Sequence, residues 1–246
     1  MSYARRLFFP LLTYFAIFSV TFAQGERPSS AVAPPSYTTY NNITRDFAPM
    51  WSPDGKQIAY YGGSRSTGFK LYIVSISGGA SKPVFDDQYL YFHPAWSPNG
   101  HRLAFTSNRS GQFQVWAMKP DGTDLMQLTS ISADYLAYPR WSPDGKQIAS
   151  GSDDKTVQIW DVVTGYNIFT SRVHAGPVTA VDWSLDGTSL ASASTDGNVQ
   201  VWDTSTGRKV HSYRHAAPVR SVAWSPDSKR LAFGGDDGTV QVWVVE

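Results

Sequence analysis

Five histidines are the side chains of this sequence best suited to bind a metal or to exchange protons near neutral pH. Their spacing matches no metal motif, because no His-Glu-x-x-His run occurs and the chain has no cysteine to complete a site. The five are His93, His101, His174, His211 and His215. We therefore expect no metal and no cofactor in this protein.

Carboxylate and nucleophile chemistry has little support either. Two pairs of adjacent aspartates, Asp153-Asp154 and Asp236-Asp237, could act as acid and base, but both lie in expected turns, where aspartate binds the backbone. No Gly-x-Ser-x-Gly elbow and no phosphate-binding Gly-Lys-Ser/Thr loop occurs. We expect a chain without catalytic residues, so its function depends on the surfaces that its folded elements present.

Those elements can be inferred from a five-residue motif that is repeated along the chain. Successive tryptophans of this motif are 45, 45, 42 and 41 residues apart. The copies are Trp51-Ser-Pro-Asp-Gly, Trp96-Ser-Pro-Asn-Gly, Trp141-Ser-Pro-Asp-Gly, Trp183-Ser-Leu-Asp-Gly and Trp224-Ser-Pro-Asp-Ser. A period of this size with glycine-bearing turns predicts an all-β fold, a β-propeller of four-stranded antiparallel blades.

Short alternating runs between turns place the blades within a domain spanning residues 37–246. The predicted units are 45–85, 93–129, 138–172, 178–214 and 219–245. The fifth unit lacks a fourth strand, and residues 37–44 have the Thr, Tyr and Ile content of a strand. We predict that this N-terminal strand closes the last of five blades; the alternative is an incomplete propeller whose missing blades come from a partner or were lost.

The front of the chain has the pattern of an export signal. Arg5 and Arg6 precede an uncharged run, Leu7–Ala23, which ends in small residues suited to cleavage before Gln24. We therefore predict a signal peptide over residues 1–23, a Pro/Ser/Ala-rich linker over 24–36, and a periplasmic or extracellular location. The alternative is an uncleaved anchor formed by residues 7–23.

Composition limits the partners of the folded part. The formal net charge is +1 and charged residues make up 17% of the chain, without a basic stripe, so we expect no nucleic-acid binding and no membrane contact beyond an anchor. The absence of cysteine excludes disulfides and thiol catalysis. These observations leave the oligomeric state open.

Two kinds of repeat can be distinguished. Units three to five resemble WD repeats, with Trp160-Asp161 and Trp202-Asp203 in place, while the fifth unit has Trp243-Val244. Units one and two are similar to the TolB-type propeller repeats of exported bacterial proteins, most clearly in the run from Leu103 to Gly111. The resemblance covers residues 45–246 and implies a propeller, but one fold serves many functions.

The WD resemblance also implies a buried chain of His, Ser, Asp and Trp in each blade. Unit four carries every member and should be the best ordered; unit five has Phe233 and Gly235 in place of the serines, and unit three has no matching histidine. The implied members are His174, Ser192 or Ser194, Asp196 and Trp202 in unit four, His215, Asp237 and Trp243 in unit five, and Asp154 and Trp160 in unit three.

In WD-like propellers, partners dock on the rim where the first strands begin. On that rim we expect a site for a protein or peptide, with Phe92 and Arg220 as anchors; the alternative is that Phe47 and Phe92 pack between blades. The candidate residues are Phe47, Tyr91, Phe92, Thr179, Arg220, Asp153, Thr195 and Asp236.

The sequence therefore favours an exported, non-catalytic scaffold. The alternative function is a propeller subunit, or a truncated propeller domain, of an exported enzyme that is hydrolase-like, peptidase-like or transport-associated. Its site would lie in the central channel, which we expect the first strands to line with small or apolar residues, among them Ala48, Ala95, Ala180, Val181, Val222 and Ala223.

Overall fold

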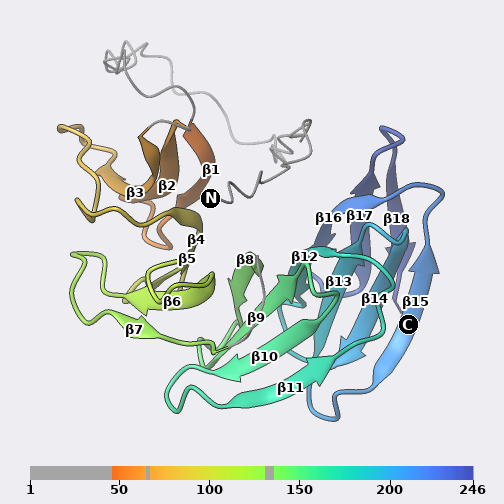
Figure 1. The fold of residues 1–246 in the computed structure, drawn as a ribbon. Helices are drawn as coiled ribbons and strands as arrows, with labels where there is room; N and C mark the ends of the chain where they lie inside the picture. The colour runs from red at the N-terminus through yellow and green to blue at the C-terminus, as the bar shows by residue number, and fades with distance from the viewer. Residues whose placement is uncertain (1–45, 65–66, 131–135, 246) are drawn as a thin grey trace, which may run out of the picture. The chain divides into compact units, whose positions relative to one another are not determined.

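The computed structural model describes residues 46–64, 67–130 and 136–245. The predicted signal peptide (1–23), linker (24–36) and closing strand (37–44) lie outside these residues. The described chain contains 18 β-strands arranged in five antiparallel sheets (Figure 1). In this part of the chain no helix has the length and apolar character needed to cross a membrane.

The five sheets follow the five repeats in chain order, and we number them as blades one to five. Blade one contains β1 (Asp46–Trp51), β2 (Gln57–Ser64) and β3 (Gly68–Ser75). Blade two contains β4 (Tyr91–Trp96), β5 (Leu103–Ser107), β6 (Gln114–Met118) and β7 (Met126–Gln127). Blade three contains β8 (Leu136–Trp141), β9 (Gln147–Ser152), β10 (Val157–Asp161) and β11 (Asn167–Ser171). Blade four contains β12 (Val178–Trp183), β13 (Ser189–Ser194), β14 (Asn198–Asp203) and β15 (Lys209–Arg214). Blade five contains β16 (Val219–Trp224), β17 (Arg230–Gly235) and β18 (Val240–Val244). Each sheet keeps its strands in sequence order, which confirms the predicted antiparallel propeller architecture. Blades two to four have the predicted four strands, whereas blades one and five have three among the described residues.

The recurring phrase forms the turn between the first two strands of each blade. In blade three the Ser142 hydroxyl donates to the Asp144 carboxylate at 2.7 Å and accepts a hydrogen bond from the Gln147 amide at 2.9 Å. Gly145 follows with φ of 70°, a conformation that glycine adopts without steric cost. Ser52, Ser97, Ser184 and Ser225 make the same pair of contacts in the other blades.

Every first strand contains one extra residue relative to its neighbour. In blade two, Phe92 and Ala95 are three residues apart, whereas their partners Thr106 and Ala104 are two apart, which is the register of a β-bulge. Blades one to three place a residue before proline at the bulge with positive φ: Ala48 at 47°, His93 at 51° and Tyr138 at 37°. A β-bulge changes the direction in which nearby side chains point. The bulges of blades one to three therefore set the orientation of Ala48, His93 and Tyr138.

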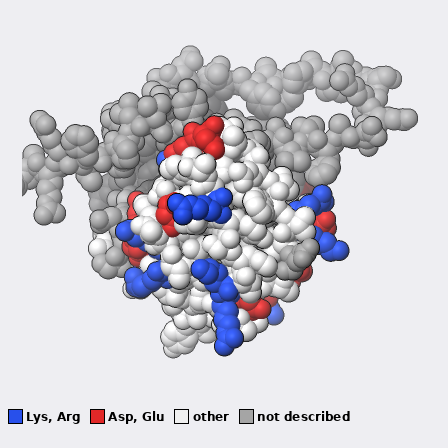
Figure 2. Space-filling model, turned by 90° about the vertical axis from the view of Figure 1, so that its right-hand side faces the viewer, with Lys and Arg blue, Asp and Glu red and all other residues white. Residues whose placement is uncertain are grey.

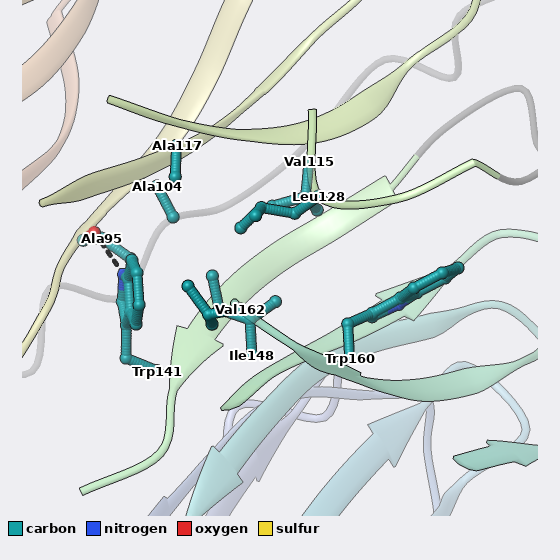
Figure 3. Packing of buried hydrophobic residues seen from close by; sticks show 9 residues of the cluster. All are labelled: Ala95, Ala104, Val115, Ala117, Leu128, Trp141, Ile148, Trp160 and Val162. Carbon is teal, nitrogen blue, oxygen red and sulfur yellow. Dashed lines mark hydrogen bonds between the residues drawn. The ribbon is translucent and has the colours of Figure 1, made fainter. Parts of the chain in front are cut away.

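The core lies between the blades. Each blade turns a leading face toward the preceding blade and a trailing face toward the next one. In the junction of blades two and three, Trp141 and Ile148 of the leading face pack with Ala104 and Val115 of the trailing face (Figure 3). The indole Nε1 of Trp141 donates to the carbonyl oxygen of Ala95 at 2.9 Å, so packing and a hydrogen bond hold the same junction.

This hydrogen bond recurs at two further junctions. Trp96 donates to the carbonyl of Met50 at 3.1 Å, and Trp183 donates to the carbonyl of Arg140 at 3.1 Å. Between blades four and five the indole of Trp224 makes no such bond; instead, its backbone amide donates to the Asp182 carboxylate at 2.8 Å. The first tryptophan, Trp51, is exposed.

Candidate functional site

The two predicted rim aromatics belong to one cluster of rings. Phe47 stacks on Tyr61 with ring centroids 5.4 Å apart, and Phe92 meets the same Tyr61 edge-on at 5.3 Å. Phe69 lies 6.0 Å from Phe47 and 5.4 Å from Phe92, and Phe113 lies 5.8 Å from Phe92. The cluster therefore joins blades one and two, and both predicted residues in it are half-buried.

Tyr91 does not lie on this rim. It is buried in the cluster that fills the junction of blades one and two, where its ring stacks on Phe85 at 5.3 Å. Its hydroxyl donates to the Asp87 carboxylate at 2.6 Å. Successive residues of a strand point to opposite faces, so Tyr91 faces the core while its neighbour Phe92 joins the aromatic cluster. The expectation that Tyr91 contacts a partner is therefore corrected.

Two of the predicted rim residues, Arg220 and Asp236, form an ion pair. Arg220 at the start of β16 donates to both carboxylate oxygens of Asp236, at 2.7 and 2.6 Å. These hydrogen bonds raise the pKa of Arg220 and lower the pKa of Asp236, so both side chains are charged. Both are also exposed. Such a bidentate pair fixes the guanidinium plane at the surface.

The remaining rim candidates have different surroundings. The Thr179 hydroxyl donates to the carbonyl of Val219 at 2.7 Å and so links blade four to blade five. Thr195 is half-buried, and its amide donates to the carbonyl of Pro177 at 3.0 Å. Asp153 is exposed in the turn between β9 and β10. Of these three, only Asp153 is exposed.

Charge is scattered rather than collected over the face shown in Figure 2. Basic and acidic side chains alternate there over a largely uncharged surface. On the described part of this face no continuous basic area appears. This distribution fits the formal net charge of +1 and favours partners other than a polyanion.

Sequence reasoning missed a second group, which collects residues from successive blades. His93 of β4 lies 4.1 Å from the ring of Tyr138 of β8 and 5.5 Å from the ring of Tyr61 of β2. Burial, followed by the charge of Arg140, lowers the pKa of His93 to about 3. The imidazole is therefore neutral at physiological pH and is not poised to exchange protons there.

Charged residues accompany this group. Burial raises the pKa of Asp182 on β12, while the positive charge of Arg140 on β8 opposes that rise. Burial also raises the pKa of Tyr138, against the charges of Arg140 and Arg220. The first strands thus carry large polar side chains beside the small and apolar ones expected from the sequence. A proline follows each of these bulge residues, in His93-Pro94 and Tyr138-Pro139, and this pattern in the sequence could have located them.

The predicted polar chain of blade four is present. His174 lies 3.1 Å from the Asp196 carboxylate through Nδ1 and 2.8 Å from the Ser192 hydroxyl through Nε2. The indole of Trp202 donates to the same hydroxyl at 3.2 Å, and the Ala175 amide donates to Asp196 at 2.8 Å. Burial lowers the pKa of His174 despite its bond to Asp196. Four side chains are therefore joined in one buried network.

The two halves of the chain match different families of propeller repeat. A family model described as TolB beta propeller domain matches residues 38–165, more than half of the chain. The chain belongs to the TolB β-propeller family. A second model, WD domain, G-beta repeat, matches residues 165–203 and 207–244. The suspected combination of TolB-type and WD repeats is thereby confirmed. Unit three, which we expected to be WD-like, falls mostly within the TolB match instead.

Curated relatives share parts of this propeller. The chain is 41% identical over 80 residues to the periodic tryptophan protein 2 homolog of Dictyostelium discoideum, covering 32% of this chain and 8% of that protein. An uncharacterised protein of Agrobacterium fabrum is 31% identical over 108 residues, covering 44% and 36%. Dipeptidyl-peptidase 5 of Porphyromonas endodontalis is 32% identical over 109 residues, covering 42% and 16%. The chain thus aligns with well under half of each relative's length.

Within this TolB-family propeller, serine 192 rather than serine 194 completes the network of blade four. The Ser194 hydroxyl instead donates to the carbonyl of Gly176 at 3.0 Å. The corresponding network is incomplete in blade three, where the Ser150 hydroxyl and the Trp160 indole are buried without a hydrogen-bond partner among the described residues. Asp154 there binds the amide and hydroxyl of Thr156, at 2.9 and 2.5 Å.

Blade five keeps only one side-chain pair of the network. His215 lies 3.0 Å from the Asp237 carboxylate, and the ring of Phe233 meets it edge-on at 5.9 Å, where blade four has a serine. A Cβ on Gly235 would lie 2.5 Å from the His215 ring, so glycine is needed there. Trp243 donates to Gln241 at 3.1 Å instead of joining the histidine.

Among the described residues no group of three His, Cys, Asp or Glu side chains could hold a metal ion.

Proposed function

We propose that this propeller is an exported, non-catalytic scaffold that binds a protein or peptide partner on the rim where its first strands begin. The observation that carries the proposal is the half-buried ring cluster around Phe47 and Phe92. Aromatic residues and arginine carry a large share of the binding energy in protein interfaces. The cluster and the fixed guanidinium of Arg220 supply both types on blades one, two and five.

The partner would be recognised by its own mixture of apolar and acidic groups. The ring cluster offers edges and faces that an apolar side chain can cover, while Arg220 can share its guanidinium between Asp236 and a second carboxylate. A peptide or a loop that presents an apolar residue and an acidic residue meets both requirements. The scattered surface charge adds no preference for a polyanion.

Affinity capture from the periplasmic or extracellular fraction tests this proposal. With the captured partner, Phe92→Ala and Arg220→Ala should each weaken binding by more than ~1 kcal/mol. Lys146→Ala is the matched control, because Lys146 is exposed in the turn at the opposite end of β8. Unchanged binding by both rim variants, with loss of binding in the control, would assign the partner to the other rim.

Export is the second part of the proposal, and it is supported by the sequence of residues 1–23. Arginines followed by an uncharged run ending in small residues are typical of a secretory signal. Mass spectrometry of the protein from its native host should find a new N-terminus near Gln24. Recovery of full-length protein starting at Met1 from the soluble cytosol would contradict export.

An enzyme-associated role is the second candidate function. It is favoured by the similarity of 42% of this chain to part of dipeptidyl-peptidase 5 of Porphyromonas endodontalis. In that case the propeller would accompany a hydrolase and supply no catalytic residue itself. Co-purification of peptidase activity with the native protein, and its loss when the propeller is removed from the mixture, would support this role over the scaffold.

A further inference from the structure

The residue before the repeated tryptophan occupies an equivalent position in every blade. In each of the five sheets it lies on the first strand and pairs with an alanine of the second strand. Three of these positions hold an uncharged apolar residue, whereas blades three and four hold opposite charges. In chain order the residues are Met50, Ala95, Arg140, Asp182 and Ala223. The two charges therefore lie at the same register on neighbouring first strands, β8 and β12.

Arg140 has no hydrogen-bonded anion. Its side chain is half-buried, its Nε is buried without a hydrogen-bond partner, and it forms no ion pair with any described residue. Other arginines of the chain pair with an aspartate at 3.0 Å or less, namely Arg102, Arg220 and Arg230. A charge that has left water in part and has no partner is costly, so the unpaired guanidinium of Arg140 indicates a site for an anionic group.

Asp182 changes the contact between blades four and five. Its carboxylate accepts a hydrogen bond from the backbone amide of Trp224 at 2.8 Å, and the indole Nε1 of Trp224 is buried without a partner among the described residues. The indoles of Trp96, Trp141 and Trp183 all donate to a carbonyl oxygen at the three preceding junctions. The junction that contains Asp182 thus lacks a hydrogen bond that the others have, and such local departures from a repeated pattern are typical of functional sites.

Arg140 and Asp182 influence each other without direct contact. Burial raises the pKa of Asp182, and the positive charge of Arg140 opposes that rise, so the two groups lie within electrostatic range. No ion pair joins them among the described residues, although both side chains are half-buried. A molecule that carries both charges can pair with both side chains at once.

Aromatic rings lie close to the guanidinium. Tyr138 is half-buried two residues before Arg140 on β8, and its ring lies 4.1 Å from that of His93. The charge of Arg140 acts on the pKa of both rings, and both are neutral at physiological pH. Neutral rings beside an arginine can cover the apolar part of a ligand whose carboxylate binds the arginine.

We propose that Arg140 and Asp182 bind a small zwitterion, an α-amino acid with an apolar or aromatic side chain. The guanidinium takes the carboxylate through two parallel hydrogen bonds, and the Asp182 carboxylate takes the ammonium group. The ligand side chain lies against the ring of Tyr138. A ligand with only one charge would leave the other protein group unpaired, so a zwitterion fits the two residues better than a simple carboxylate does.

This site is independent of the proposed rim site. It uses Arg140 and Asp182 on β8 and β12, whereas the rim site uses Phe92 and Arg220. A free amino acid can bind whether or not a protein partner is present. Failure of either proposal would therefore leave the other unaffected.

Three matched probes test the need for both charges. L-phenylalanine, 3-phenylpropanoate and 2-phenylethylamine share a ring and differ in carrying both charges, the carboxylate alone or the ammonium alone. Titration calorimetry of the purified full chain should show that L-phenylalanine binds at least ~10-fold more tightly than either singly charged probe. Thermal unfolding in the presence of each apolar and aromatic amino acid extends the test to other side chains, because a bound ligand raises the melting temperature.

Two conservative variants locate the site. Arg140→Met and Asp182→Asn should each weaken amino-acid binding at least ~10-fold, and Asp182→Asn keeps an oxygen for the amide of Trp224. Arg230→Met is the control, because Arg230 is exposed and pairs with Asp227, and it should bind as wild type does.

Circular dichroism and urea unfolding should show that both site variants keep the fold. Three results would each overturn the proposal: no binding by any apolar or aromatic amino acid, equal binding of L-phenylalanine and 3-phenylpropanoate, or unchanged binding in both site variants.

Discussion

Blades two and four achieve the same packing by different means. Both bury an alanine-bearing face under the tryptophan of the next blade. Both end their first strand in a serine turn, in which the serine hydroxyl donates to the Asn99 amide oxygen in blade two and to the Asp186 carboxylate in blade four. Blade four adds a buried polar network centred on His174, whereas blade two packs rings around Tyr91 and Phe105. The packing of a tryptophan on an alanine-bearing face is therefore common to TolB-type and WD repeats. The two types differ in the side chains beside that contact, which are aromatic rings in blade two and a polar network in blade four.

The largest expected effect tests whether the junction is shared. Trp141→Ala in the TolB-matched half and Trp183→Ala in the WD-matched half should each lower the free energy of unfolding by ~3–5 kcal/mol, because both indoles are buried and hydrogen-bonded. Urea unfolding measures both. Trp51→Ala is the control and should change monomer stability by less than ~1 kcal/mol, since this indole is exposed. A large loss in only one half would show that the halves are held differently.

The next effect is the pH dependence of stability that the buried His93 adds in the TolB-matched half. Burial and Arg140 lower the pKa of His93 to about 3 in the folded state, so below pH ~6.5 the unfolded chain binds a proton that the folded chain does not. Stability is therefore full above pH ~6.5 and falls on acidification, by about 2 kcal/mol between pH 7 and pH 5 from this group. His93→Asn should flatten the pH profile of urea unfolding over that range. If the free energy of unfolding of His93→Asn fell with pH as steeply as that of wild type, the lowered pKa of His93 would be contradicted.

A matched pair of serine variants isolates the polar network. Ser192→Ala in blade four removes the hydroxyl bonded to His174 and Trp202 and should cost ~1–3 kcal/mol. Ser150→Ala at the same register in blade three removes a buried hydroxyl without a partner among the described residues, and should be neutral or slightly stabilising. Equal losses in the two variants, measured by thermal and urea unfolding, would mean that the network contributes nothing specific.

The smallest expected effect concerns the polar rim. Arg220→Ala removes an exposed bidentate pair with Asp236 and should change the free energy of unfolding by only ~0–1 kcal/mol, because solvent screens exposed charges. The same variant is expected to weaken partner binding. A stability loss as large as that of Trp183→Ala would place Arg220 in the fold rather than in a binding surface.

The repeating parts of the structure were predictable because each depends on residues close in sequence. The turn after each tryptophan needs only a serine, a carboxyl or amide two residues later, and a residue that tolerates positive φ. The members of the blade-four network were also predictable, although Ser192 and Ser194 could not be separated. Alternate residues of a strand share a face, so spacing alone leaves both possible.

The rest depended on contacts between repeats. The bulge before each tryptophan shifts the alternation, so spacing did not reveal that Tyr91 is buried while Phe92 joins the ring cluster. The group of His93, Tyr138 and Arg140 comes together only when neighbouring first strands approach each other. The exposure of Trp51 depends on whether another face covers it, which its identical motif cannot indicate.

The presence of two different packing faces on each blade has a genetic consequence. Each repeat encodes a tryptophan half and an alanine–valine half, so an in-frame duplication or deletion of one whole repeat leaves every remaining junction correctly matched. The boundary of blades three and four already joins a TolB-type repeat to a WD repeat through the bond from Trp183 to the carbonyl of Arg140. Unequal crossing-over between such repeats can therefore change their number, or mix their families, without requiring a new interface to evolve.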